Sequence, residues 1–406
     1  IVLENTAQWR GGGIYCSNNS NPAFWNCQII GNRIVPIPPA TPDFGGGISC
    51  YRSSPNLLDC LIAANDGRFG GGVGCIESSP TLTNCIISGN SATIPTGGAG
   101  GGGIFAHNAS SPILTNCIIS GNYAHDWNAG TLYCQGNSHP VLTNCTISSN
   151  SSNDGRSGGI LVNTGSTPRL INCIVENLSG IAIIEEEPIF NLPWNKANVL
   201  VSHSLFANNA VADFRNWTEQ GAVNYTGGDL INANVNGAHD NVAGSPDPLY
   251  VAAITGQWTA PPVYDPGTNL TTLTASGTSF PISPGLRGRL INANMAQSRQ
   301  ALIMANTGET VSVLGDITAA TGPYGYVQGD EQFMVLDYDL NGSSPCVNVG
   351  DDTAERLRDT DIEGRPRVGA ADIGAYECQA PAGVIVRSIT PQSGPVTNAE
   401  TIVFEV

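Results

Sequence analysis

Charge, long apolar runs and helical periodicity are scarce in this sequence. Charged side chains make up 12% of the 406 residues, about half of what is usual for a soluble domain. The 16 Lys and Arg against 33 Asp and Glu give a net charge of −17. There is no basic stripe to neutralise phosphates, so nucleic acid is not expected as a partner. No apolar run reaches membrane-spanning length and no signal peptide is present, so the sequence predicts no membrane-spanning segment.

The chain also lacks a clear start and end to its pattern. Residues 1–5 (IVLEN) match the end of a repeat unit such as residues 86–90 (IISGN). Residues 381–406 are typical of the first strands of an immunoglobulin-like β-sandwich that the sequence does not complete. We therefore expect this chain to be a fragment of a longer protein.

A repeat rich in Gly, Asn and Cys fills the first half of the chain. In residues 70–90 (GGGVGCIESSPTLTNCIISGN), glycines precede a short strand, Ser-Ser-Pro makes a turn, and a second strand runs through residues 82–87. Six copies align at intervals of 33, 25, 32, 28 and 28 residues, each with a proline five residues before its cysteine. The pairs that anchor the copies are Asn26-Cys27, Asp59-Cys60, Asn84-Cys85, Asn116-Cys117, Asn144-Cys145 and Asn172-Cys173.

Repeats of this length without a helical period predict a parallel β-helix. Propeller blades need more residues, and helical solenoids need an apolar period that is absent here. In a β-helix each coil stacks about 4.8 Å above the last and pairs its backbone with both neighbours. Glycine and proline then suit the corners, and a buried Asn repeated in register can bond to its copies. We predict an all-β fold with about seven coils in residues 1–210.

The repeat resembles the right-handed parallel β-helix repeats of large secreted bacterial surface proteins, over residues 1–210. The resemblance implies a secreted or extracellular, cell-surface-associated protein. It leaves the function open, because β-helices occur as lyases, hydrolases, adhesins and inert stalks.

The second half of the chain has a different character. Residues 211–250 predict a terminal coil with loops, and residues 251–330 contain four strand-like segments with turn signals between them. We interpret residues 251–330 as a small inserted β-barrel or sandwich. The predicted strands lie at residues 271–274, 286–291, 300–305 and 310–314.

Residues 331–380 carry a series of short motifs. LDYDL at 336–340, SPCV at 344–347, DIEGRPR at 361–367 and DIGAYE at 372–377 follow DPL at 247–249. In this order they resemble the C-terminal signature of choice-of-anchor Q proteins, although Glu363 stands where that family usually has Asp and Cys378 follows the final Glu. The resemblance implies a C-terminal cap, which would cover the unpaired strand edges of the last coil.

The twelve cysteines fall into three sets. Six form the column of the anchoring pairs, and four more form a second column in which Ala106 and Val162 also occur. Disulfides or a metal array are one interpretation of the columns, but CxxC spacing is absent and Ala or Val substitutes, so we favour stacked buried thiols. Cys346 and Cys378 stand apart and are candidates for a disulfide in an exported protein.

Candidate ligand-binding residues lie in the loops between coils. Trp9, Phe44, Phe69 and Trp127 each come just before a glycine cluster, so a regular stack would place them along one edge. They could stack on sugar rings, or they could fold over the corner and shield the core, which we favour. Asp59 stands in a column of Asn, and we interpret it as a substitution in that column rather than as a catalytic acid.

Carboxylates alternate in the predicted cap, at Asp359, Asp361 and Glu363. They could bind a structural calcium ion, which is the one cofactor that the sequence suggests, although the bidentate Glu of a complete calcium loop is missing. An ion pair of Arg365 or Arg367 with Asp372 is an equal alternative.

These features favour a non-catalytic structural or adhesive module of a larger bacterial protein, with polysaccharide as the candidate partner. In-register charged residues, which acid–base catalysis would require, are almost absent from the constant strands. A polysaccharide lyase or glycoside hydrolase is the first alternative. A self-associating subunit of an extracellular filament or sheath is the second.

Overall fold

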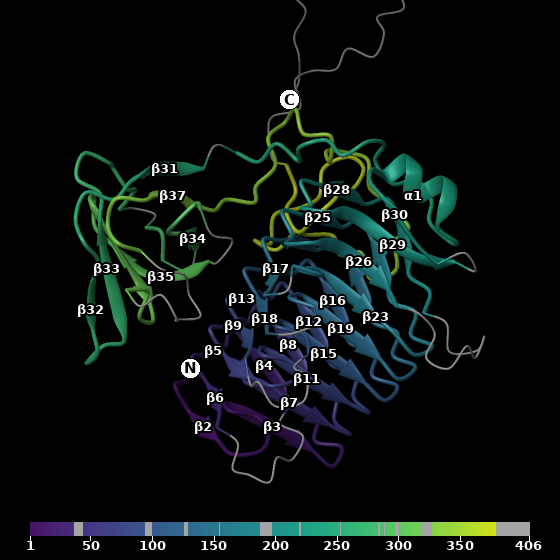
Figure 1. The fold of residues 1–406 in the computed structure, drawn as a ribbon, viewed down its shortest axis with the longest axis horizontal. Helices are drawn as coiled ribbons and strands as arrows, with labels where there is room; N and C mark the ends of the chain where they lie inside the picture. Colours follow the sequence, from purple (N-terminus) through teal and green to yellow (C-terminus); the bar gives the residue numbers. More distant parts are fainter. Residues whose placement is uncertain are drawn as a thin grey trace, which may run out of the picture.

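The structure, a computed structural model, is an all-β fold with one short helix (Figure 1). It describes residues 1–35, 44–93, 100–125, 129–153, 155–186, 197–218, 221–251, 253–282, 285–287, 289–296, 300–318 and 327–378. Successive coils stack into a parallel β-helix, and a separate antiparallel sheet lies beside the stack (Figure 1). This is the fold class that the repeat predicts. The predicted immunoglobulin-like start at residues 381–406 lies outside the described residues.

Each regular coil contains four strands, which form four parallel sheets. Sheet 1 consists of β1 (Val2–Leu3), β5 (Gln28–Ile30), β9 (Leu61–Ala63), β13 (Ile86–Ser88), β17 (Ile118–Ser120), β21 (Thr146–Ser148), β25 (Ile174–Glu176) and β28 (Leu205–Ala207). Sheet 2 consists of β2 (Thr6–Ala7), β6 (Arg33–Ile34), β10 (Asp66–Gly67), β14 (Ser91–Ala92), β18 (Tyr123–Ala124) and β22 (Ser151–Ser152).

The other two sheets complete the cross-section of the coils. Sheet 3 consists of β3 (Ile14–Ser17), β7 (Ile48–Tyr51), β11 (Val73–Ile76), β15 (Ile104–His107), β19 (Leu132–Gln135), β23 (Ile160–Val162), β26 (Ile181–Glu185), β29 (Ala212–Thr218) and β30 (Gly221–Tyr225), the last of them antiparallel to β29. Sheet 4 consists of β4 (Ala23–Trp25), β8 (Asn56–Leu58), β12 (Thr81–Thr83), β16 (Ile113–Thr115), β20 (Val141–Thr143), β24 (Arg169–Ile171) and β27 (Leu200–Ser202).

The second strand that the sequence predicts at residues 82–87 is two strands, β12 and β13. Asn84 lies between them with a φ of 51°, a left-handed conformation that Asn tolerates better than most residues. It breaks the extended run and turns the chain from sheet 4 into sheet 1. The same bend recurs on every coil, and we call its residues the bend column: Asn26, Asp59, Asn84, Asn116, Asn144, Asn172, His203 and Asp240, all with positive φ.

Inside the coils, a ladder of buried Asn side chains follows the apolar core. Each amide oxygen accepts two N–H groups of the preceding coil, as Asn122 Oδ1 does from Asn90 N at 3.0 Å and Asn90 Nδ2 at 2.9 Å. The ladder contains Asn32, Asn65, Asn90, Asn122 and Asn150, and none of these is exposed to solvent. It confirms the predicted register of buried Asn, which satisfies polar groups that the coil would otherwise leave unpaired.

Glycines permit the coils to approach each other at the corner before sheet 3. A Cβ at Gly71 would lie 2.2 Å from the carbonyl oxygen of Ser91 and 2.5 Å from that of Gly102. No side chain fits at such distances. The glycine cluster of each repeat is therefore a requirement of the stack.

The small sheet is antiparallel and lies in the order β31-β37-β34-β35-β36-β33-β32. Its strands span Ile254–Gln257, Gln332–Val335, Leu290–Asn292, Ala301–Asn306, Thr310–Leu314, Leu270–Thr274 and Val263–Asp265 in that order. Trp258 and Phe333 stack in its own core, with ring centroids 4.1 Å apart. The small sheet ends at Val335, five residues after the predicted end of the inserted domain at residue 330.

Helix α1 (Gly228–Asn234) closes the end of the stack (Figure 1). Its Ile231, together with Val235 just after it, belongs to the core cluster of the coils. Residues 336–378, which we call the flank segment, run instead along the side of the stack and bond to Asn116, Asn144 and Asn172. The cap predicted at residues 331–380 thus lies against the flank, because α1 and β30 already cover the last strands. No helix in the described ranges is long and apolar enough to cross a membrane.

Candidate functional site

The outer face of sheet 1 is where the coils, the small sheet and the flank segment meet. Ile30, Ala63 and Ile118 of the coils form one buried cluster with Leu290, Leu302 and Leu314 of the small sheet and with Tyr338 and Ala375 of the flank segment. The cluster is apolar because alternate residues of each sheet 1 strand point outward, away from the Ile87 column of the core. This contact fixes the position of the small sheet beside the coils.

A cleft of about 850 Å³ opens between these three parts. The coils contribute Asp59 and Asn84 of the bend column, and the small sheet contributes Arg287 and Arg289. The flank segment contributes Asp337, Tyr338, Glu363 and Tyr376. The cleft therefore combines carboxylates, guanidinium groups and phenol rings, which can hydrogen-bond to and pack against a polar organic ligand.

The charges in this cleft are partly paired. Arg289 Nη1 lies 2.7 Å from Asp337 Oδ2, and Asp59 accepts a hydrogen bond from Asn84 Nδ2 at 3.0 Å. Partial burial raises the pKa of Glu363, whose carboxylate lies 3.7 Å from Arg365 Nε. Arg287 is exposed and forms no ion pair within the part of the chain that the structure describes. Arg287 and Glu363 are thus exposed charged groups of opposite sign that a ligand in the cleft can reach.

A second cleft of about 580 Å³ shares Asp337 and Tyr338 with the first. Glu176 of β25 lies in its wall, at the register position that carries Ser120 and Ser148 on the preceding coils. Glu176 is buried, its Oε1 atom has no hydrogen-bond partner among the described residues, and burial raises its pKa to about 7. A carboxyl group with this pKa holds a proton near neutral pH, which a general acid requires.

We expect Glu176→Gln to stabilise the protein above neutral pH. The folded pKa of about 7 exceeds the ordinary value of 4.5, so the folded state binds the proton more tightly than the unfolded state. The wild type therefore loses stability as the pH rises from about 5 to 8, by about 3 kcal/mol at most. The variant has no carboxyl group there, so its advantage over the wild type should appear between pH 5 and pH 8 in urea denaturation.

Glu77→Gln is the control for this comparison. Glu77 is 41% exposed and pairs with Arg52 on the surface, so its removal should change stability by less than about 1 kcal/mol. A Glu176→Gln variant whose difference from the wild type stays constant over this pH range would contradict the assignment of a buried, protonated carboxyl group.

Sequence comparison places the coils in a known family. The family described as "Right handed beta helix region" matches residues 1–100 and 69–241, which together exceed half of the 406 residues. The chain belongs to the right-handed β-helix family. Neither a curated protein nor a solved structure matches it. The family establishes the fold of the coils, and the finer resemblance to choice-of-anchor Q proteins remains a prediction.

The predicted aromatic edge is only partly assembled. Phe44 and Phe69 lie on successive coils with ring centroids 5.4 Å apart, and both contact Phe105. Trp9 is 62% exposed and lies outside this stack, because Arg10 rather than Trp9 pairs with Phe44. Trp127 lies outside the described residues. Phe44 is 7% exposed and Phe69 half-buried, so the two rings cover the corner, as in the shielding interpretation, and offer little surface to a sugar.

Of the three predicted calcium ligands, Asp359 and Glu363 are exposed, whereas Asp361 is engaged by protein groups. Asp361 is fully buried and accepts hydrogen bonds from the backbone N–H groups of Glu363, Arg365 and Glu377. Its Oδ2 also lies 2.7 Å from the Arg365 guanidinium. Arg367 pairs with Glu377, and Asp372 accepts backbone N–H groups, so neither arginine pairs with Asp372 as the alternative proposed. A cation would have to displace these donors from Asp361.

The cysteines are all free thiols. Cys50, Cys75, Ala106, Cys134 and Val162 occupy one register position, which confirms the second predicted column. Burial raises the pKa of Cys134 to about 12, so its thiol stays protonated and unreactive. Cys346 and Cys378 pack in one apolar cluster without a bond between them, so the expected disulfide is absent. In a cluster of Ile and Leu, two thiols can serve as small apolar side chains.

Sequence reasoning missed the clefts because their walls come from three distant parts of the chain. It also missed Glu176, although a signal was available. Ser88, Ser120 and Ser148 precede it at equivalent positions of the repeat, so a charged residue there departs from the pattern. Sequence reasoning also missed His203, which stands at a bend that carries Asn on most coils.

Proposed function

We propose that this chain is an extracellular structural module that binds polysaccharide in the cleft of about 850 Å³ beside sheet 1. That cleft is the observation on which the proposal rests. Its paired hydrogen-bonding groups suit vicinal hydroxyls, which can donate to a carboxylate and accept from a guanidinium at the same time. Tyr376 provides an aromatic wall that can pack on the apolar face of a sugar ring.

The charge of the wall favours a neutral or weakly charged saccharide. Asp59, Asp337 and Glu363 outnumber Arg287 and Arg289 in the lining, and the whole chain carries a net charge of −17. A densely acidic polysaccharide would be repelled by this field. The rigid stack of coils holds the cleft at a fixed place on its flank, which suits a module that links a polymer to a larger protein.

We expect the double variant Arg287→Ala/Glu363→Gln to bind a neutral oligosaccharide at least ~10-fold more weakly than the wild type. Loss of two charge-assisted hydrogen bonds, at about 1.5–3 kcal/mol each, would account for such a change. A glycan array identifies the ligand first, and isothermal titration calorimetry then compares the variants. Arg287 is exposed and the side chain of Glu363 is 49% exposed, so the fold should tolerate their replacement.

Trp9→Ala serves as the matched control. Trp9 belongs to the predicted aromatic edge and is 62% exposed, so its removal tests binding at that edge. The proposal predicts unchanged affinity in Trp9→Ala. Weaker binding in Trp9→Ala, with full affinity in the double variant, would move the ligand from the cleft to the coil edge and contradict the proposal.

A polysaccharide-cleaving enzyme is the second candidate, and Glu176 is the observation that favours it. Its carboxyl group lines the cleft of about 580 Å³ and has a pKa raised to about 7 by burial. Asp337 lines the same cleft, so the wall contains a second carboxyl group. Two carboxyl groups in different environments are the arrangement on which glycoside hydrolysis depends. Asp337 already pairs with Arg289, which is why we place binding before cleavage.

A further inference from the structure

The seventh residue of the bend column differs chemically from the six before it. The first six coils carry Asn or Asp at this bend, the seventh carries His203, and the next turn carries Asp240. Backbone pairing continues the register, because His203 N donates to His239 O at 3.3 Å and Ser202 forms a bridge with His239. His203 and Asp240 thus lie on successive turns, with His239 directly before Asp240.

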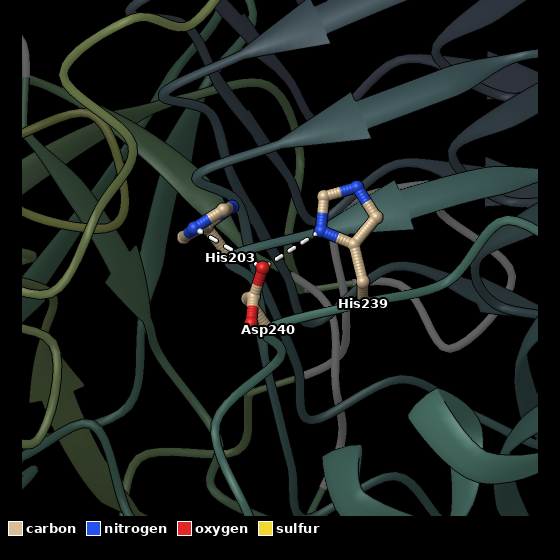
Figure 2. A group of neighbouring side chains, drawn as sticks. All are labelled: His203, His239 and Asp240. Carbon is tan, nitrogen blue, oxygen red and sulfur yellow. Dashed lines mark hydrogen bonds and ion pairs between the residues drawn. The ribbon is translucent and has the colours of Figure 1, made fainter.

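Figure 2 shows the two imidazole rings on either side of the Asp240 carboxylate. His239 Nδ1 lies 2.9 Å from Asp240 Oδ2, and His203 Nε2 lies 3.8 Å from the same oxygen. The three ligand atoms all lie within 4.8 Å of one another. The rings are nearly perpendicular, with centroids 5.7 Å apart, so their nitrogens converge on the carboxylate instead of stacking face to face.

This geometry is close to that of a zinc site. Ligand atoms about 2.0–2.1 Å from a tetrahedral zinc ion lie roughly 3.3 Å from each other. The observed separations of 2.9 and 3.8 Å fall on either side of that value, so small side-chain rotations would admit the ion. Two imidazoles and one carboxylate are ligands that zinc accepts readily, whereas calcium and magnesium prefer oxygen alone.

The surroundings leave the group accessible. The side chains of His239 and Asp240 are 61% and 67% exposed, and that of His203 is 22% exposed. The flank segment bonds to Asn116, Asn144 and Asn172, and among the described residues it forms no hydrogen bond to His203 or Asp240. Its Asp351 lies nearby, and a hydrogen bond from Thr353 and, to a smaller extent, the charges of His203 and His239 lower the pKa of that carboxyl group. The buried Nδ1 of His203 has no partner among the described residues, so Nε2 is the atom that faces the carboxylate.

We infer that His203, His239 and Asp240 bind a zinc-type transition-metal ion, with solvent in the remaining coordination position. Bound there, the ion links the turn after α1 to the bend between β27 and β28. It would stabilise the closing end of the stack, where the regular backbone pairing of the coils gives way to α1 and loops. The inference is independent of the saccharide cleft, since these residues belong to neither cleft wall.

The test is isothermal titration calorimetry with zinc chloride at pH 7.5, on the chain without a histidine tag. We expect one ion per chain, no binding of magnesium, and weaker zinc binding as the pH falls, because protons compete with the metal for its ligand atoms. His239→Ala and His203→Asn should each weaken zinc binding at least ~10-fold. His203→Asn should keep the fold because it restores the residue that the bend carries on most coils.

His139→Ala is the matched control, because His139 is exposed on the coils and contacts Thr167 rather than a second histidine. Cobalt in place of zinc adds a spectroscopic readout, with d–d bands expected and no thiolate charge-transfer band, since the twelve thiols lie elsewhere. Zinc binding that is absent, or that survives unchanged in both His239→Ala and His203→Asn, would overturn the inference. A thiolate band would overturn it as well.

Discussion

Arg367→Met should lower the free energy of unfolding of the flank segment by about 3–5 kcal/mol. Arg367 Nη1 lies 2.7 Å from Glu377 Oε2, with the two side chains 7% and 1% exposed. The same guanidinium donates to Asn116 Oδ1 at 3.0 Å and so ties the flank segment to the bend column. Methionine keeps much of the side-chain volume but leaves the Glu377 carboxylate buried without its partner. Removal of one partner from a buried ion pair is strongly destabilising, because the remaining charge is uncompensated.

Urea denaturation combined with hydrogen exchange measures this effect. Exchange should accelerate in residues 346–377 first, because the coils have their own core and can stay folded when the segment detaches. Arg367→Met/Glu377→Gln should recover most of the lost stability, since it removes both charges.

The matched control is Arg169→Met. Arg169 lies 2.9 Å from Glu355 and also joins the coils to the flank segment, but these two side chains are 45% and 44% exposed. This substitution should cost less than about 1 kcal/mol, and equal costs for the two variants would contradict the account of the flank contact.

Asn122→Leu should destabilise the coils by about 4 kcal/mol. Asn122 Oδ1 accepts two N–H groups of Asn90, and its Nδ2 donates to Ile87 O and to Asn150 Oδ1, both at 2.9 Å. Leucine has a similar size but leaves these buried donors and acceptors unpaired, at about 1–3 kcal/mol for each group. The loss should appear in the unfolding of the whole stack, because the ladder runs from coil to coil.

Asn56→Leu is the control for the ladder. Asn56 is exposed at the start of β8, in register with Thr81, and Ile113 and Val141 occupy the same position on later coils. An apolar residue is therefore already accepted there, and the substitution should change stability by no more than about 0.5 kcal/mol. If Asn122→Leu cost as little as Asn56→Leu, the ladder would contribute nothing specific to the stack.

The coils could be predicted because their constraints repeat. The same local backbone requirements recur from coil to coil. They are met by glycine before sheet 3, by proline before sheet 4 and by the Asn-Cys pair at the bend. The four-stranded cross-section could not be predicted from the same pattern. Asn84 interrupts an otherwise strand-like run through its φ alone, and nothing in its neighbours distinguishes a bend from a continuous strand.

The candidate sites depend on contacts that no local pattern reports. Arg367 and Asn116 are 251 residues apart in sequence, so neither the position of the flank segment nor the cleft beneath it follows from the repeat. The aromatic edge was inferred from position relative to the glycines, and a difference of one residue placed Arg10 in register with Phe44 and left Trp9 outside. Where the loops of a repeat vary in length, the spacing predicts which residues form each coil. It does not predict which residues at the edge of one coil pair with those of the next.

The measurement that most directly tests the central claim, that the chain binds polysaccharide without cleaving it, is the chain length of a bound glycan after prolonged incubation. The account predicts that a neutral polysaccharide retained by the wild type, and released by Arg287→Ala/Glu363→Gln, is recovered at its original length with no new reducing or unsaturated ends. Shortened products that disappear in Glu176→Gln would contradict it and would identify the second cleft as an active site.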